Sequence, residues 1–214
     1  MYDLKRMNET VRIIASVSIV WAVIALFVQW IQSRAQDRKE YGVKAGSVIK
    51  GIIYNFTWAM TPRHKESMRL YPIEFIIGVL MHVGIFLAIV RVLLILINPQ
   101  ITQISQIMQI VITILLGIAA LCGLYQFLRR VLSKELRALS CFDDYLAIII
   151  TIDFLIAAFM HEIGFLSPPI FLIHATVVFI YLPIGKLKHA LFFFIARAEF
   201  GARLGYRGTY PGKS

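Results

Sequence analysis

Four of the five histidines in this 214-residue sequence lie inside strongly apolar stretches, where an ionisable side chain is costly to keep. They are His82, His161, His174 and His189, whereas His64 lies in the polar stretch TPRHKES. In apolar surroundings such a side chain usually faces the interior of a helix bundle. There an imidazole can ligate a metal ion or form a hydrogen bond between helices. The positions of the four residues along their helices help to decide between these interpretations.

The composition of the chain is that of an integral membrane protein. Hydrophobic residues make up 59% of the sequence, charged residues make up 16%, and the mean hydropathy is +0.75, well outside the usual range of soluble domains. A membrane-spanning helix needs about 20 apolar residues, and five runs are long enough: 13–31, 72–97, 107–128, 144–166 and 169–196. The sequence therefore predicts an all-α fold, with a five-helix transmembrane bundle in residues 1–200 and a cytoplasmic tail in residues 201–214.

Basic residues indicate how the bundle is oriented. The segment 33–71 carries eight Lys or Arg residues and the connection 129–144 carries four, whereas the connections 98–106 and 162–168 carry none. Because cytoplasmic connections are enriched in Lys and Arg, we predict that the N-terminus lies outside, and that the segment 33–71 and the C-terminus are cytoplasmic. This topology explains most of the net charge of +10, so we expect no nucleic acid as a partner. The segment 33–71 can hold a helix at the lipid head groups or a landing surface for a soluble subunit.

Depth in the membrane groups the four histidines into two pairs. At a rise of about 1.5 Å per residue, His82 lies about 15 Å from the cytoplasmic start of its helix, and His189 about 10–12 Å from the cytoplasmic end of the fifth helix. His161 and His174 each lie within about 8 Å of the outer ends of the fourth and fifth helices. A six-coordinate haem b requires two histidines at one depth on different helices, because its axial imidazoles approach the iron from opposite faces. We therefore predict an inner haem iron held by His82 and His189.

Three residues near His82 extend the haem hypothesis. Gly78 and Gly84 have no side chain and would leave room for a porphyrin, although glycine serves ordinary helix packing as well. Arg91 lies near the outer depth, where it can bind a haem propionate or extend its side chain to the membrane surface. These three residues are therefore candidates for cofactor binding.

Two carboxyl groups inside the predicted spans are candidates for carrying protons. Asp153 lies near the membrane middle on the fourth predicted helix, where it could relay a proton. Glu162 lies beside His161 at the outer end of that helix and could accept a proton released when a quinol is oxidised. A solvated carboxylate at the rim of the bundle is the other interpretation of Glu162.

Two short segments of the sequence resemble a known family. The stretch LMHVGIFLAIV around His82, and the spacing of Pro183, Lys186 and His189, resemble the gamma subunit of respiratory nitrate reductase and its relatives. These relatives include the membrane subunits of heterodisulfide reductase and of a sulfite-reduction electron-transfer complex. In the family, a His followed by Val-Gly-Ile in helix two pairs with a His six residues past a Pro in helix five. The resemblance thus implies the same inner pair, His82 with His189, and adds Lys186 to the cofactor-binding residues.

The outer haem departs from the pattern of the nitrate-reductase subunit. The second helix-two histidine of that pattern would fall at Val92 in this sequence. The outer haem can therefore be held by His161 and His174, which is the arrangement we favour, can have one protein ligand, or can be absent. This departure is closer to the membrane subunit of heterodisulfide reductase.

The resemblance also implies a function. Family members hold b haems in five transmembrane helices, oxidise quinol and pass electrons to a cytoplasmic iron–sulfur subunit. We therefore expect haem b as the cofactor, menaquinone or another quinone as the substrate, and an iron–sulfur subunit and lipid as partners. We expect a multi-pass protein of the cell's inner, or plasma, membrane that acts within an oxidoreductase complex and is no stand-alone enzyme. The alternative is a haem-free transmembrane scaffold or a proton- or ion-conducting bundle.

Overall fold

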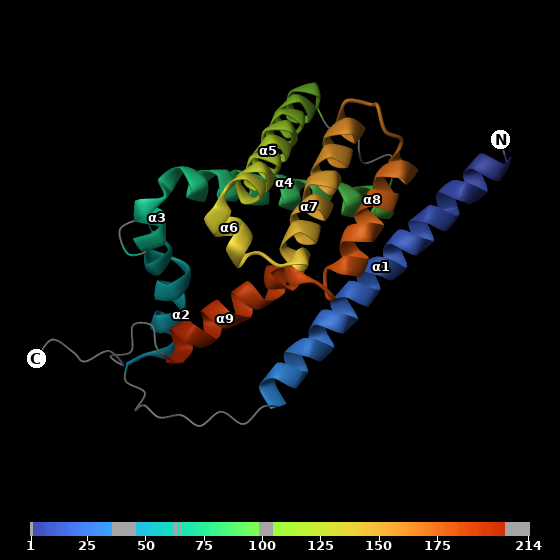
Figure 1. Ribbon diagram of the computed structural model, residues 1–214. Helices are drawn as coiled ribbons and strands as arrows, with labels where there is room; N and C mark the ends of the chain where they lie inside the picture. The colour runs from blue at the N-terminus through green and yellow to red at the C-terminus, as the bar shows by residue number, and fades with distance from the viewer. Residues whose placement is uncertain (1, 36–45, 62–63, 65, 99–104, 204–214) are drawn as a thin grey trace, which may run out of the picture. The chain divides into compact units, whose positions relative to one another are not determined.

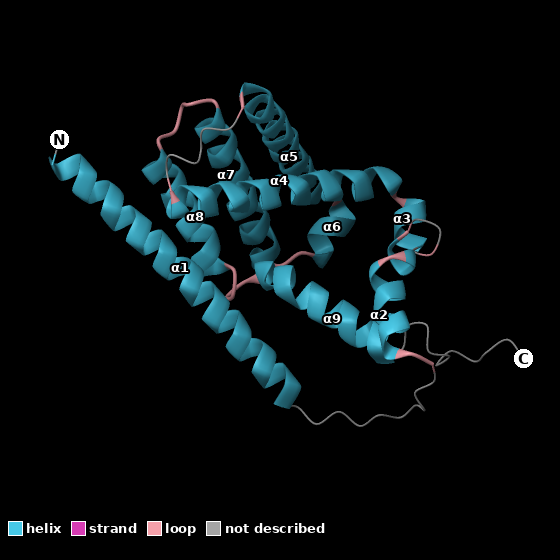
Figure 2. Cartoon of the chain, turned by 180° about the vertical axis from the view of Figure 1, so that it is seen from behind, coloured by secondary structure: helices cyan, strands magenta, loops and turns pink. Residues whose placement is uncertain are grey.

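The structure is a computed structural model, and it describes residues 2–35, 46–61, 64, 66–98 and 105–203. Within these ranges every regular element is a helix (Figure 1, Figure 2). The longer helices are α1 (Tyr2–Ala35), α4 (Pro72–Ile97), α5 (Gln106–Leu132), α7 (Phe142–Glu162), α8 (Pro168–Tyr181) and α9 (His189–Arg203). The shorter ones are α2 (Val48–Phe56), α3 (Glu66–Leu70), α6 (Lys134–Leu139) and two 3₁₀ turns, Trp58–Met60 and Lys186–Lys188. The all-α prediction is confirmed for this part of the chain.

Several of these helices are suited to a membrane. Three are long and apolar enough to cross one, namely residues Asn8–Arg34 of α1, and the whole of α4 and α5. A fourth crossing results if α8 and the segment Lys186–Arg203 together form one broken span. The helix α7 is not among these candidates. The chain thus has three or four candidate membrane-spanning helices, and the predicted number of five and the orientation of the termini are not confirmed.

The fifth predicted span is not one continuous helix. The apolar run 169–196 is divided between α8, which ends at Tyr181, and α9, which begins at His189. Pro183 lacks the backbone N–H that a helix needs, and the N–H of Gly185 donates to the carbonyl of Tyr181 at 3.0 Å. A side chain at position 185 would collide with the ring of Tyr181, so this turn requires glycine. The depth assigned to His189 assumed an unbroken fifth helix, and that assumption is wrong.

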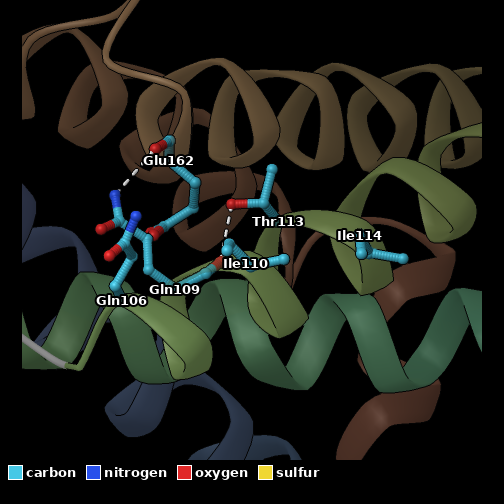
Figure 3. A pocket seen from close by; sticks show the side chains of 6 residues that line it. All are labelled: Gln106, Gln109, Ile110, Thr113, Ile114 and Glu162. Atoms are coloured by element: carbon cyan, nitrogen blue, oxygen red, sulfur yellow. Dashed lines mark hydrogen bonds between the residues drawn. The ribbon is translucent and has the colours of Figure 1, made fainter.

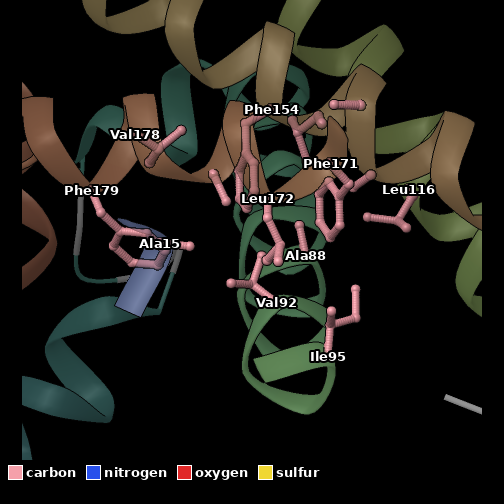
Figure 4. Packing of buried hydrophobic residues seen from close by; sticks show 14 of the residues in the cluster. Ala15, Ala88, Val92, Ile95, Leu116, Phe154, Phe171, Leu172, Val178 and Phe179 are labelled. Atoms are coloured by element: carbon pink, nitrogen blue, oxygen red, sulfur yellow. The ribbon is translucent and has the colours of Figure 1, made fainter. Parts of the chain in front are cut away.

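The chain consists of two compact units. The first contains residues 1–25 and 76–187, and the second contains residues 26–75 and 188–214. In the first unit, α1, α4, α5, α7 and α8 bury a shared apolar core (Figure 4), which includes Ala15, Ala88, Val92, Leu116, Phe154, Phe171, Leu172 and Val178. Small residues at such contacts let helices approach each other closely, as is common between helices in membranes.

Gly84 lies at one of the closest contacts in this core. A Cβ atom at this position would overlap the Cβ of Ala119 on α5 and would lie 3.1 Å from Leu155 Cδ2 on α7. Gly84 is therefore a packing glycine, and the space that we predicted beside it for a porphyrin is filled by protein. At Gly78, one and a half turns earlier on α4, no other atom of the described chain lies within 4 Å of such a Cβ.

The second unit is organised by the pairing of α2 with α9. A Cβ atom at Gly201 would lie 2.7 Å from the carbonyl oxygen of Gly51, so the two backbones are nearly in contact. The buried Asn55 side chain donates to the Arg197 carbonyl at 2.6 Å and accepts from Arg197 Nη1 at 2.9 Å. The helix α9 continues to Arg203, so the first residues of the predicted tail are helical, and residues 204–214 lie outside the described residues.

Candidate functional site

His82 has the geometry of a prepared metal ligand. It lies on α4, and its Nδ1 atom is 2.7 Å from the carbonyl oxygen of Gly78, one turn earlier. A carbonyl oxygen only accepts hydrogen bonds, so Nδ1 carries the ring proton and Nε2 carries the lone pair. Histidines that ligate metals commonly donate their other ring N–H to a carbonyl or carboxylate in this way. The His82 side chain is exposed on the surface of the first unit.

His161 shows the same arrangement at the end of α7. Its Nδ1 atom lies 3.0 Å from the carbonyl oxygen of Leu166. Its ring also stacks on the ring of Phe171 from α8, with 5.1 Å between centroids and an angle of 11° between planes. The stacking holds the half-buried imidazole against the core, and the proton on Nδ1 again leaves Nε2 as the acceptor.

His174 pairs with a carboxylate instead of a carbonyl. On α8, its Nδ1 atom lies 2.7 Å from Asp153 Oδ2 on α7, and the two side chains are 32% and 48% exposed. Asp153 precedes His161 by eight residues, about 12 Å along the helix. The structure thus joins His174 to Asp153 and packs His161 on Phe171. It shows no contact between His161 and His174 among the described residues, so their pairing at an outer haem stays a prediction.

Arg91 and Glu162 form a buried ion pair between α4 and α7. Arg91 Nε donates to Glu162 Oε1 at 2.5 Å and Arg91 Nη2 donates to Oε2 at 3.2 Å, so the contact is bidentate. The two side chains are only 7% and 1% exposed. Arg91 therefore does not extend to the membrane surface, and Glu162 is not a solvated rim carboxylate. The remaining nitrogen, Arg91 Nη1, is buried and has no hydrogen-bond partner in the described part of the chain.

A cavity of about 320 Å³ lies beside this ion pair, between α5 and α7. Gln109 Nε2 donates to the Glu162 carbonyl at 3.2 Å, and the Thr113 hydroxyl donates to the Gln109 carbonyl at 2.8 Å. Figure 3 shows the polar side chains gathered at one end of the cavity, with Ile114 at the other. Gln106 completes the polar lining. The sequence analysis missed these glutamines, although residues 106, 109 and 113 share one face of a helix.

Two further predicted site residues, Lys186 and His189, lie where α8 ends and α9 begins. Lys186 Nζ donates to Asp144 Oδ2 at 2.6 Å, at the start of α7. His189 is the first residue of α9 and is exposed. His82 belongs to the first unit and His189 to the second, so their pairing at an inner haem also stays a prediction.

The described residues contain no group of three or more His, Cys, Asp or Glu side chains that could hold a metal ion. A haem needs only one or two protein ligands, so a single imidazole such as that of His82 is a chemically suitable ligand type. No protein-family model matches the chain. Neither the curated proteins nor the solved structures provide a match.

Proposed function

We propose that the chain is the haem b membrane subunit of a respiratory oxidoreductase complex in the plasma membrane. In this role it transfers electrons between a membrane quinone and a cytoplasmic iron–sulfur subunit. The bound haem would supply one-electron transfer through the membrane. The protein's own residues would hold the haem, exclude water around it and manage the protons of the quinone.

The observation that carries the proposal is the tautomer of His82. Its Nδ1–H is committed to the Gly78 carbonyl at 2.7 Å, which directs the Nε2 lone pair away from the backbone of α4. Such a hydrogen bond is compatible with ligation of an iron by Nε2. His189 is the proposed second ligand of the inner haem. His161 and His174 are the proposed ligands of an outer haem, and the Nδ1 atoms of these two residues are hydrogen-bonded to oxygen atoms.

The contacts of Glu162 favour a different residue as the proposed proton acceptor. Both carboxylate oxygens of Glu162 accept hydrogen bonds from the buried Arg91 guanidinium, so neither oxygen faces a quinone. Asp153 and His174 form a half-exposed pair in an apolar region. A carboxylate paired with an imidazole is a suitable general base for a quinol hydroxyl. We therefore assign this role to the Asp153 carboxylate, which His174 holds in place by its Nδ1 hydrogen bond.

The visible spectrum of the purified chain tests the proposal. The dithionite-reduced protein should show a low-spin b-type band, which should be lost or strongly weakened in His82→Ala and in His189→Ala. His64→Ala is the matched control, because His64 lies outside the apolar runs and its side chain bonds to neighbours in its own segment, Trp58 and Thr61. A colourless preparation that still folds, or a band unchanged in both variants, contradicts the proposal.

A second candidate function is a haem-free bundle that scaffolds a complex or conducts protons or ions. It is favoured by one observation. Arg91 pairs with Glu162, and Asp153 pairs with His174, so these polar side chains have partners without a cofactor. In that case the purified chain would bind no haem. Reconstituted in liposomes that contain a pH-sensitive dye, it would conduct protons at a rate lowered by Asp153→Asn.

A further inference from the structure

The sequence ranges of the second unit carry most of the charge of the protein. Residues 26–75 and 188–214 contain 13 of the 22 Lys and Arg residues and 5 of the 12 Asp and Glu residues, a net charge of +8 out of +10. The chain enters this unit along α1 and leaves it at the start of α4, and both helices are candidate membrane spans. A strongly basic unit is thus attached to the membrane at both ends of the segment 36–71.

The helix α2 in this unit has two different faces. Gly51 and Asn55 face α9 and are buried. Ile49 and Ile53 lie about 200° around the helix from these residues, and they are 69% and 56% exposed. Lys50 is exposed between the two faces. The side of α2 that points away from α9 is therefore an apolar stripe, Ile49 and Ile53, with a cation beside it.

Exposed aromatic side chains also occur in this unit. Trp58 follows α2 directly and is 56% exposed, with its indole N–H held by His64 Nε2 at 3.1 Å. On α9, Phe194 and Phe200 are also exposed. Exposed apolar and aromatic residues on a short helix, flanked by Lys and Arg, are typical of a helix that lies in the interface of an anionic bilayer.

We propose that the α2 stripe, Ile49 and Ile53, together with Trp58, inserts among anionic lipid head groups, and that Lys50 binds their phosphates. Charge complementarity favours this occupant, because the cytoplasmic leaflet is anionic and the unit carries a net charge of +8. The attachment to α1 and α4 keeps α2 within reach of the lipid surface. This inference does not depend on the haem or on the quinone.

Fluorescence of Trp58 tests the proposal in the full chain. Trp21 and Trp30 are replaced by Phe, and the protein is reconstituted in bilayers with equal amounts of brominated phosphatidylglycerol or brominated phosphatidylcholine. Bromine quenches indole fluorescence at short range, so an inserted Trp58 is quenched in both. The brominated anionic lipid should quench at least about two-fold more strongly, because it is enriched around Lys50.

Two charge reversals provide the matched comparison. Lys50→Glu should remove most of the difference between the two lipids, whereas Lys134→Glu, the same change in the first unit, should preserve it. Ile53→Asp should reduce quenching by both lipids. The proposal is overturned if both lipids quench Trp58 equally, if the two lysine variants behave alike, or if neither lipid quenches Trp58. The last result would favour a protein partner for the α2 stripe and Trp58.

Discussion

At the scale of single residues, ionisable side chains in the first unit are paired with each other. Arg91 meets Glu162 and Asp153 meets His174, in both cases across two helices. An unpaired charge inside a membrane is costly, so each pair both satisfies its members and fixes the register of two helices. The two pairs differ in exposure: the first is buried and the second is about half exposed. We therefore expect the first to matter for stability and the second for chemistry.

Removing one member of the buried pair should destabilise the protein strongly. Glu162→Leu leaves the Arg91 guanidinium buried without a counter-charge, and such changes typically cost about 3–5 kcal/mol. The double variant Arg91→Leu with Glu162→Leu should recover most of this loss, because no unpaired charge remains. Thermal unfolding of the detergent-solubilised protein measures both effects.

The Arg34–Glu199 pair is the control for this experiment, since its side chains are 61% and 29% exposed. Glu199→Gln should cost less than about 1 kcal/mol, as exposed ion pairs usually do. If Glu162→Leu were no more destabilising than Glu199→Gln, the buried contact between Arg91 and Glu162 would not be present in the membrane.

Removing the Asp153 carboxylate should slow the proposed oxidation of quinol. Asp153→Asn keeps a hydrogen bond to His174 but loses the base, so in the proposed haem subunit reduction by quinol should slow on the order of 100-fold, with the same amount of haem bound per chain. Glu135→Gln, an exposed carboxylate beyond the end of α5, should have no effect. A rate that Asp153→Asn leaves unchanged would refute the assignment of the proton acceptor.

At the scale of helices, small residues allow the closest approaches between helices in the core. Gly84 on α4 allows contact with Ala119 on α5. Gly84→Ala adds a methyl group where the backbone of α5 leaves no room, and overpacking of this kind typically costs about 1–3 kcal/mol. Gly78→Ala on the same helix should be nearly neutral, because nothing lies within 4 Å of its Cβ. The difference between the two melting temperatures measures the contact, and equal melting temperatures would contradict it.

The sequence predicts some of these helices well and others poorly. The run 72–97 coincides with α4, because Pro72 begins a long, mostly apolar stretch that ends before Asn98 and Pro99. The division between α8 and α9 was missed, because Pro183 and Gly185 lie inside a run, 169–196, that stays apolar overall in spite of Lys186 and Lys188. Hydropathy measures how apolar a segment is on average, and a local turn inside an apolar run does not change that average.

The contacts of the candidate site could be predicted only in part. Depth along a helix indicated which polar residues would be costly to place inside the predicted spans. It did not reveal that His174 meets Asp153 and not His161, because the choice of partner depends on how α7 and α8 pack against each other. Likewise, Arg91 and Glu162 are 71 residues apart in the chain. Only the crossing of α4 and α7 brings them together.

At the scale of the whole molecule, the number of membrane crossings depends on α7. It is not one of the candidate spans, yet its 21 residues would extend about 30 Å, close to the thickness of the hydrocarbon core. Its two intramembrane carboxyl groups, Asp153 and Glu162, both have partners in the structure. A helix whose charges are paired within the bundle can remain in a membrane, so we predict that α7 crosses it.

Labelling with a membrane-impermeant maleimide in intact cells tests this prediction. In a Cys122→Ser background, the exposed native Cys141 precedes α7 and the introduced Ser167→Cys follows it. If α7 crosses with the predicted orientation, Ser167→Cys reacts from outside and Cys141 reacts only after permeabilisation. Ser105→Cys, which precedes the candidate span α5, should behave like Ser167→Cys. If Ser167→Cys, like Cys141, is labelled only after permeabilisation, both ends of α7 lie on the same side of the membrane. This result would exclude a five-span bundle, because every predicted crossing after α5 requires α7 to pass through the membrane.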